Sequence, residues 1–135
     1  MAELTRIQIV VFLQSCDLFS HCRADEILRI AGIAREKRFA AGESIYTRNG
    51  AADELYCLVH GEVTVSGEGE RQVVGRLQTF GVEEILCGRL RKGTAAASED
   101  TLVLAINAED FFDLLANDIE IVRALFRHLL QGRSG

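Results

Sequence analysis

A glycine turn followed by a lone arginine is the segment of this sequence best suited to chemistry. Phe80-Gly81 opens the segment, a one-turn helix signal follows the turn, and Arg91 then precedes an apolar strand. Such a turn directs backbone N–H groups at the start of a small helix, and a nearby guanidinium completes an anion site. The ligand that suits these groups is a phosphate.

Other chemistries have weaker support. Cys16, His21 and Cys22 lie close together in the sequence, but a closed metal site needs a further ligand at short spacing. His60 is the only histidine in residues 37–106, which excludes a cupin-type metal centre. No serine or cysteine lies in a recognisable nucleophile elbow. We therefore expect no enzymatic activity, no metal and no cofactor, and we expect reduced thiols at Cys16, Cys22, Cys57 and Cys87.

Length and composition indicate one domain covering residues 1–135. Hydrophobic residues make up 48% of the chain, which is enough for a core, and the net charge is -5. That charge, with scattered basic residues, argues against direct nucleic-acid binding. No apolar run reaches the roughly 18 residues of a membrane span, and no secretory signal is present. We expect a cytoplasmic domain, including the cytosolic domain of a larger or membrane protein.

Helical spacing dominates both ends of the chain. In residues 1–36, apolar residues recur at helical spacing within 3–15 and again within 24–34. In residues 107–131, Asn107 and Asn117 resemble helix N-caps. The last helix then carries an apolar stripe that we expect to lie in the core: Val122, Leu125, Phe126 and Leu129.

Residues 37–106 instead show short strands separated by glycines, with a hairpin tip at 67–70. Many short strands with glycine turns are typical of a sheet that closes on itself. The predicted fold is mainly β, a double-stranded β-helix or jelly-roll-like β-roll, with N-terminal and C-terminal helices.

Three motifs, in this order, resemble the cyclic-nucleotide-binding domain family. Asp17-Leu18-Phe19-Ser20 is similar to the turn after the family's first helix. Residues 38–46 (RFAAGESIY) are similar to its F-x-x-G-E-x-I-F strand entry, and residues 49–63 to its G-D-x-x-D-x-L-Y-x-I-x-x-G-x-V. The resemblance spans nearly the whole chain and implies the β-roll of that family.

The family's phosphate-binding cassette reads roughly F-G-E-x-A-L-L-x-x-x-x-R-x-A-x-V. Phe80, Gly81 and Arg91 match it, but Val82 replaces the glutamate that accepts the ribose hydroxyl, and Lys92 replaces a small residue. Losing a hydrogen bond to a charged group weakens binding by roughly 10- to 150-fold. The ligand-binding residues that the resemblance implies are Phe80, Gly81, Val82, Glu83, Arg91, Lys92, Gly93 and Thr94.

The sequence allows two roles for Arg91: a phosphate ligand, or a structural arginine paired with Glu83, Glu84 or a helix end. The function that we predict is a non-enzymatic regulatory module with weakened or lost cyclic nucleotide binding, acting as a sensor or interaction domain of a larger protein. One alternative is a working sensor of cyclic AMP, cyclic GMP or another small phosphate. The other is a docking or dimerisation domain with a vestigial pocket, contacting a second copy or the parent protein through its terminal helices.

Overall fold

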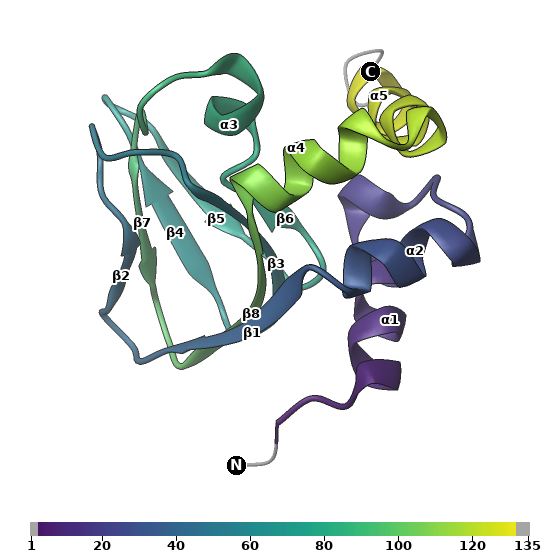
Figure 1. The fold of residues 1–135 in the computed structure, drawn as a ribbon. Coiled ribbons are helices and arrows are strands. Elements are labelled where there is room, and N and C mark those ends of the chain that lie inside the picture. Colours follow the sequence, from purple (N-terminus) through teal and green to yellow (C-terminus); the bar gives the residue numbers. More distant parts are fainter. Residues whose placement is uncertain (1–2, 132–135) are drawn as a thin grey trace.

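Two four-stranded antiparallel sheets face each other, and helices cover the outer face of one of them (Figure 1). The structure is a computed structural model that describes residues 3–131. One sheet has the order β1 (Ala34–Phe39), β8 (Thr101–Asn107), β3 (Glu54–His60), β6 (Thr79–Phe80). The other has the order β2 (Ser44–Tyr46), β7 (Thr94–Ala97), β4 (Val63–Ser66), β5 (Arg71–Val74). The predicted β-roll with flanking helices is confirmed.

Strand β3 shows why the sheets form two separate cores. Six of its seven residues are buried, because both of its faces are covered. Leu55 and Cys57 point to the helices, whereas Tyr56 and Leu58 point between the two sheets. Alternation of side chains along a strand produces this division.

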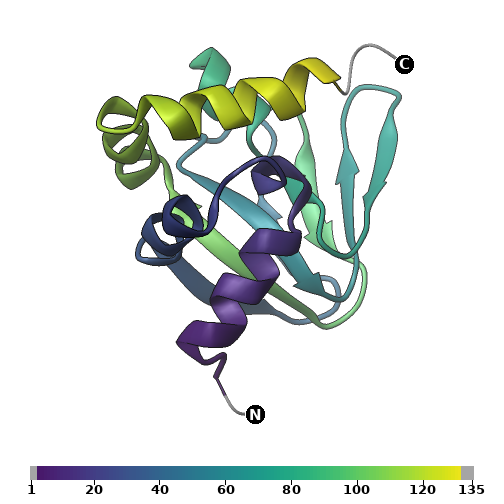
Figure 2. The ribbon, with the colours of Figure 1, turned by 90° about the vertical axis from the view of Figure 1, so that its right-hand side faces the viewer.

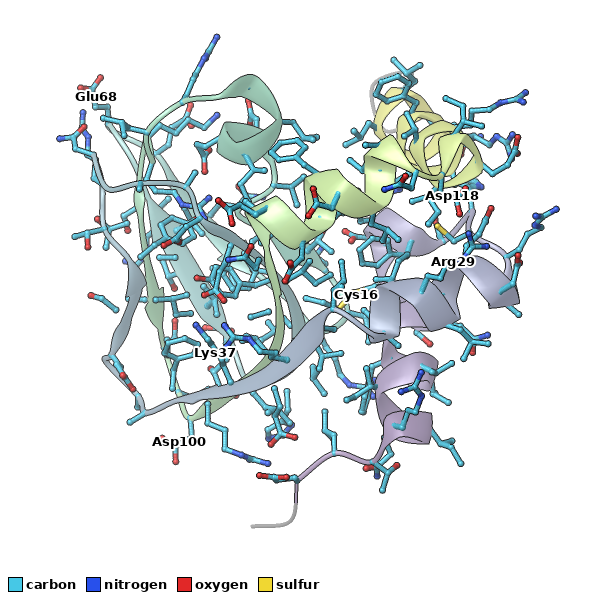
Figure 3. The ribbon with its side chains drawn as sticks, viewed as in Figure 1. Cys16, Arg29, Lys37, Glu68, Asp100 and Asp118 are labelled. Atoms are coloured by element: carbon cyan, nitrogen blue, oxygen red, sulfur yellow. A yellow bond between two sulfur atoms is a disulfide. The ribbon has the colours of Figure 1, made fainter. Side chains whose placement is uncertain are left out.

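The helices belong to two groups. At the N-terminal end lie α1 (Arg6–Ser15), the short 3-10 helix η1 (Asp17–Phe19) and α2 (Ala24–Ala31), and at the C-terminal end lie α4 (Ala108–Ala116) and α5 (Ile119–Gln131). Figure 2 shows α5 lying across the N-terminal helices, and it packs on η1. Arg29 of α2 pairs with Asp118 at the start of α5, so an ion pair joins the two groups of helices (Figure 3). The remaining helix, α3 (Glu83–Cys87), stands at one end of the roll (Figure 1).

Some predicted boundaries differ from those of the structure. The first strand begins at Ala34, before the expected start of the strands at residue 37. Asn107 caps α4 as predicted, since its Oδ1 accepts from the N–H groups of Glu109 and Asp110. The N-terminus predicted at Asn117 is wrong, because Asn117 ends α4 and the neighbouring Asp118 accepts the first N–H groups of α5.

The buried face of the last helix also differs from the apolar stripe that was predicted to lie in the core. Of the four stripe residues only Leu125 is buried, while Phe126 is 58% exposed. The buried face of α5 consists of Ile121, Ala124 and Leu125. Because α5 lies on η1 along this face, the rest of the predicted stripe is directed away from the core.

The prediction of four reduced cysteines is wrong for two of them. Cys16 and Cys57 form a disulfide, 41 residues apart in sequence, and both are buried in the core under the helices (Figure 3). Cys16 ends α1 and Cys57 lies on β3, so the disulfide joins the N-terminal helices to the sheet. Cys22 and Cys87 are free.

Candidate functional site

The predicted anion segment joins β6 to β7 at one end of the roll. Gly81 makes the turn after β6 with a positive φ of 79°, and Gly88 ends α3 in the left-handed conformation. The chain then returns along residues 49–50: the Arg91 N–H donates to the Gly50 carbonyl, and the Arg91 carbonyl accepts from the Asn49 N–H. These two bonds fix the backbone from which the Arg91 side chain departs.

The side chain of Arg91 is fully buried, with 0% exposure. Its Nη1 donates to the Glu84 carboxylate at 2.9 Å and to the Gly81 carbonyl at 2.8 Å, and its Nη2 donates to the Glu54 carbonyl. The guanidinium carbon lies 4.0 Å from the centre of the Tyr46 ring, within cation–π distance. In this structure Glu84 is therefore the partner of Arg91 among the three groups considered from the sequence.

The close contact between Gly81 and Arg91 depends on glycine. A Cβ at residue 81 would lie 3.1 Å from Nη1 and 3.4 Å from Nη2 of Arg91. The positive φ also disfavours any other residue. The glycine of the motif thus admits the guanidinium beside the turn.

Aromatic rings form the wall behind Arg91. Tyr56 stacks on Phe80 with centroids 5.1 Å apart, and Tyr46 stacks on Tyr56 at 6.3 Å. Burial raises the pKa of Tyr46 to about 12, although the charge of Arg91 opposes the shift. Burial, and the carboxylate of Glu54, also raise the pKa of Tyr56. Both phenols therefore stay neutral at physiological pH.

Glu54 connects Arg91 to the first strand. Its carboxylate accepts from Lys37 at 2.6 Å, from Arg35 at 3.0 Å and from the Tyr56 hydroxyl at 3.2 Å. Burial favours the neutral acid, but the hydrogen bond and charge of Lys37, with the bonds from Arg35 and Tyr56, outweigh it and lower the pKa of Glu54. Figure 3 labels Lys37 on β1. The Glu54 carboxylate is thus already neutralised, and only its backbone carbonyl serves Arg91.

A second ion pair lies at the rim of the cassette. Lys92 Nζ donates to Glu83 at 2.9 Å, and both side chains are 66% exposed. The hydrogen bond from Lys92 to Glu83 raises the pKa of the lysine. Val82, half-buried, presents only an aliphatic side chain beside them.

An open groove of about 1610 Å³ runs along this end of the roll. All the predicted ligand-binding residues line it except Thr94, whose hydroxyl accepts from the Arg48 N–H. Phe126, Leu129 and Leu130 of α5 line the groove as well. The groove is therefore bounded by the polar cassette and by exposed apolar side chains of the last helix.

Two contacts of the site were missed from the sequence. Tyr46 ends the motif at residues 38–46, so its aromatic position was a usable signal for a partner of Arg91. The Glu54 carbonyl has no such signal, because any residue supplies a backbone carbonyl. Within residues 3–131 no cluster of three or more histidines, cysteines and carboxylates could hold a metal ion. In the same range no helix has the length and apolar character to cross a membrane.

The sequence model of the cyclic nucleotide-binding domain family matches residues 36–118, which is more than half of the chain. The chain belongs to this family. Its members act as regulatory domains, and the cassette lies within the matched range. Among curated proteins, the chain is 25% identical over 138 residues to the potassium channel SKOR of Arabidopsis thaliana, covering 98% of this chain but 17% of the channel. The chain therefore spans about one sixth of that relative.

Solved structures share the fold. A putative cyclic nucleotide-binding protein from Geobacter metallireducens has a TM-score of 0.79 and 22% identity, covering 96% of this chain and 95% of its own. A regulatory subunit of a cAMP-independent protein kinase A from Trypanosoma brucei, with a TM-score of 0.76 and 21% identity, covers 87% of this chain and 46% of its own. That structure is a mutant bound to cAMP. In it a glutamate is replaced by alanine and, seven and eight positions later, a threonine by arginine and a valine by alanine.

Proposed function

We propose that this chain is a non-catalytic regulatory domain in which cyclic nucleotide binding is weakened, and that it acts as a sensor or interaction domain of a longer protein. The observation that carries the proposal is the side chain of Arg91, which is fully buried and held by Glu84, Gly81 and Glu54. A phosphate in the groove has to compete with these partners for the guanidinium.

Two further features of the cassette support weak binding. Val82 offers no oxygen to a ribose hydroxyl, and such a lost charged hydrogen bond weakens affinity by roughly 10- to 150-fold. Lys92 lines the groove, and its Nζ donates to Glu83. Val82 lacks a contact that a cyclic nucleotide would need, and Lys92 occupies more space than the small residue that it replaces.

The Trypanosoma brucei mutant supports the same direction. Its three substitutions have the spacing of Glu84, Arg91 and Lys92 in this chain, and the form bound to cAMP has alanine, arginine and alanine there. This chain has only the arginine of those three. This comparison supports the proposal that glutamate and lysine at residues 84 and 92 oppose cyclic nucleotide binding.

The lengths of its relatives support a place for the chain in a larger protein. It corresponds to about one sixth of the SKOR channel, so residues 1–135 would form one domain of a longer, cytoplasmic or cytosol-facing assembly. The terminal helices would supply its contacts, since large apolar side chains are exposed there: Ile7, Val11, Phe126 and Leu129. Exposed apolar surface of this kind commonly marks an interface.

Calorimetric titration with cyclic AMP and cyclic GMP tests the proposal. We expect no sub-micromolar binding by the unmodified chain and tighter binding by Val82→Glu, because the new carboxylate can accept the ribose hydroxyl. Val82→Leu is the matched control, which keeps the apolar character and should bind no better than the unmodified chain. Sub-micromolar binding by the unmodified chain would overturn the proposal and make it a working cyclic nucleotide sensor.

A further inference from the structure

We propose that Glu84 is the residue that closes this cassette to phosphate, by acting as the counter-ion that the chain itself supplies to Arg91. Removing the Glu84 carboxylate would then open a site for a small, singly charged phosphate. This inference rests on the proposed function, because it explains why the cassette binds weakly.

The geometry of α3 lets Glu84 reach Arg91, whereas the neighbouring Glu83 points elsewhere. Glu84 and Glu83 are adjacent in α3, and successive helical residues point about 100° apart. Glu83 consequently reaches outward to Lys92, whereas Glu84, only 8% exposed, reaches inward to Arg91 at 2.9 Å. The two carboxylates are identical in chemistry and differ only in direction.

The charge balance around Arg91 depends on Glu84. The other two hydrogen-bond acceptors of the guanidinium are the neutral carbonyls of Gly81 and Glu54. The carboxylate of Glu54 is bound by Lys37 and Arg35 instead. A buried cation without a counter-ion is strongly unfavourable, so Glu84 supplies the negative charge that keeps Arg91 inside.

An external anion has access to the same place. Glu84, Gly81 and Arg91 all line the groove, so the space of the Glu84 carboxylate is continuous with it. The Arg91 Nε is buried and has no hydrogen-bond partner among the described residues, which leaves one donor unused. A phosphate diester carries one negative charge and would replace the lost carboxylate charge for charge.

Calorimetric titration of Glu84→Ala and Glu84→Gln with cyclic AMP, cyclic GMP and inorganic phosphate tests this inference. Both variants remove the charge, and the glutamine keeps the size. We expect each to bind at least one of these phosphates about tenfold or more tightly than the unmodified chain. Glu109→Ala is the control and should change affinity by less than about threefold, since Glu109 is exposed on α4 and does not line the groove. Tighter binding of the nucleotides than of phosphate would identify a nucleotide site, and equal binding a general phosphate site.

Dependence on Arg91 is the second part of the test. Adding Arg91→Lys to Glu84→Gln should remove the gain, because a lysine lacks the planar donor set. Where a Glu84 variant is too unstable to titrate, its melting temperature should rise as phosphate or cyclic AMP is added, since a ligand that binds only the folded state stabilises it.

Three results would overturn the inference: no gain in either Glu84 variant, a gain that survives Arg91→Lys, or no rise in the melting temperature of an unstable variant. Weak binding by the unmodified chain together with any of these leaves the proposed function standing. Tight binding by the unmodified chain defeats the proposed function itself, so the two failures are distinct.

Discussion

The interior and the rim of the cassette hold two ion pairs of the same length but of opposite character. Glu84–Arg91 and Glu83–Lys92 both join α3 to the returning loop, and both have N–O distances of 2.9 Å. The side chains of Arg91 and Glu84 are 0% and 8% exposed, whereas those of Lys92 and Glu83 are both 66% exposed. Exposed pairs contribute about 0–1 kcal/mol, whereas breaking a buried pair costs about 3–5 kcal/mol. Burial, rather than distance, makes the inner pair a structural element and leaves the outer pair a surface contact.

Arg91→Met should have the largest effect of any cassette substitution on stability. It leaves the Glu84 carboxylate buried without its partner, which costs about 3–5 kcal/mol in the free energy of unfolding. Urea denaturation measures the loss. The control is Arg89→Met in the same loop, where the arginine is exposed and the cost should stay within about 0.5 kcal/mol. Equal losses for the two variants would remove the distinction between interior and rim.

Gly81→Ala should be the next most damaging change. An added methyl group would meet the Arg91 guanidinium at 3.1 Å, in a backbone conformation that costs an alanine about 1–2 kcal/mol. Gly88→Ala is a matched control, because Gly88 also has a positive φ but nothing lies within 4 Å of its added Cβ. We expect thermal denaturation to show a larger loss at residue 81. A larger loss at residue 88 would mean that Arg91 does not lie against the turn.

The ion pairs of Glu54 are intermediate in exposure between the inner and the outer pair. The Glu54 carboxylate is nearly buried, but its partners Arg35 and Lys37 are more exposed. Its pKa is lowered in the folded protein, so its contribution is complete above the ordinary glutamate pKa of about 4.3 and is lost as the pH falls through the lowered value. Glu54→Gln should therefore be less stable than the unmodified chain by about 1 kcal/mol at neutral pH. This difference should shrink in acid. Chemical denaturation at several pH values measures it, and a difference that grows in acid would contradict the assignment.

Lys92→Ala should have the smallest effect. Its pair with Glu83 is exposed, so the free energy of unfolding should fall by less than about 0.5 kcal/mol, and less still in high salt. The same denaturation experiment in low and high salt checks both statements. A loss as large as that of Arg91→Met would show that the rim is as tightly held as the interior.

The fold followed from the sequence because it depends on patterns that the sequence displays. Alternation and glycine spacing in residues 37–106 predicted the roll, and Asn107 marked the start of α4. The orientation of α5 could not be predicted from the sequence, because periodicity identifies an apolar stripe but not which part of it packs on η1. The disulfide between Cys16 and Cys57 was missed for a related reason: a separation of 41 residues gives no sign of contact.

The candidate site could be predicted from the sequence only in part. Motif spacing located Gly81 and Arg91 but left the partner of Arg91 open among several groups. The choice of Glu84 over Glu83 depends on the direction in which each residue leaves a helix of five residues, and that direction is set by how the helix sits on the roll. The hydrogen bond from Arg91 to the Glu54 carbonyl is still harder to predict from the sequence, since it depends only on where the backbone of β3 lies.

A pair of double-mutant cycles tests most directly whether Glu84 holds Arg91 inside the protein. One cycle combines Glu84→Gln with Arg91→Met, the other Glu83→Gln with Lys92→Met, and urea denaturation gives the coupling energy of each pair. We predict a coupling of about 2 kcal/mol or more for the inner pair and less than about 0.5 kcal/mol for the outer pair. A coupling near zero for Glu84 and Arg91 would contradict this, because it would mean that the arginine is not held by the chain's own carboxylate.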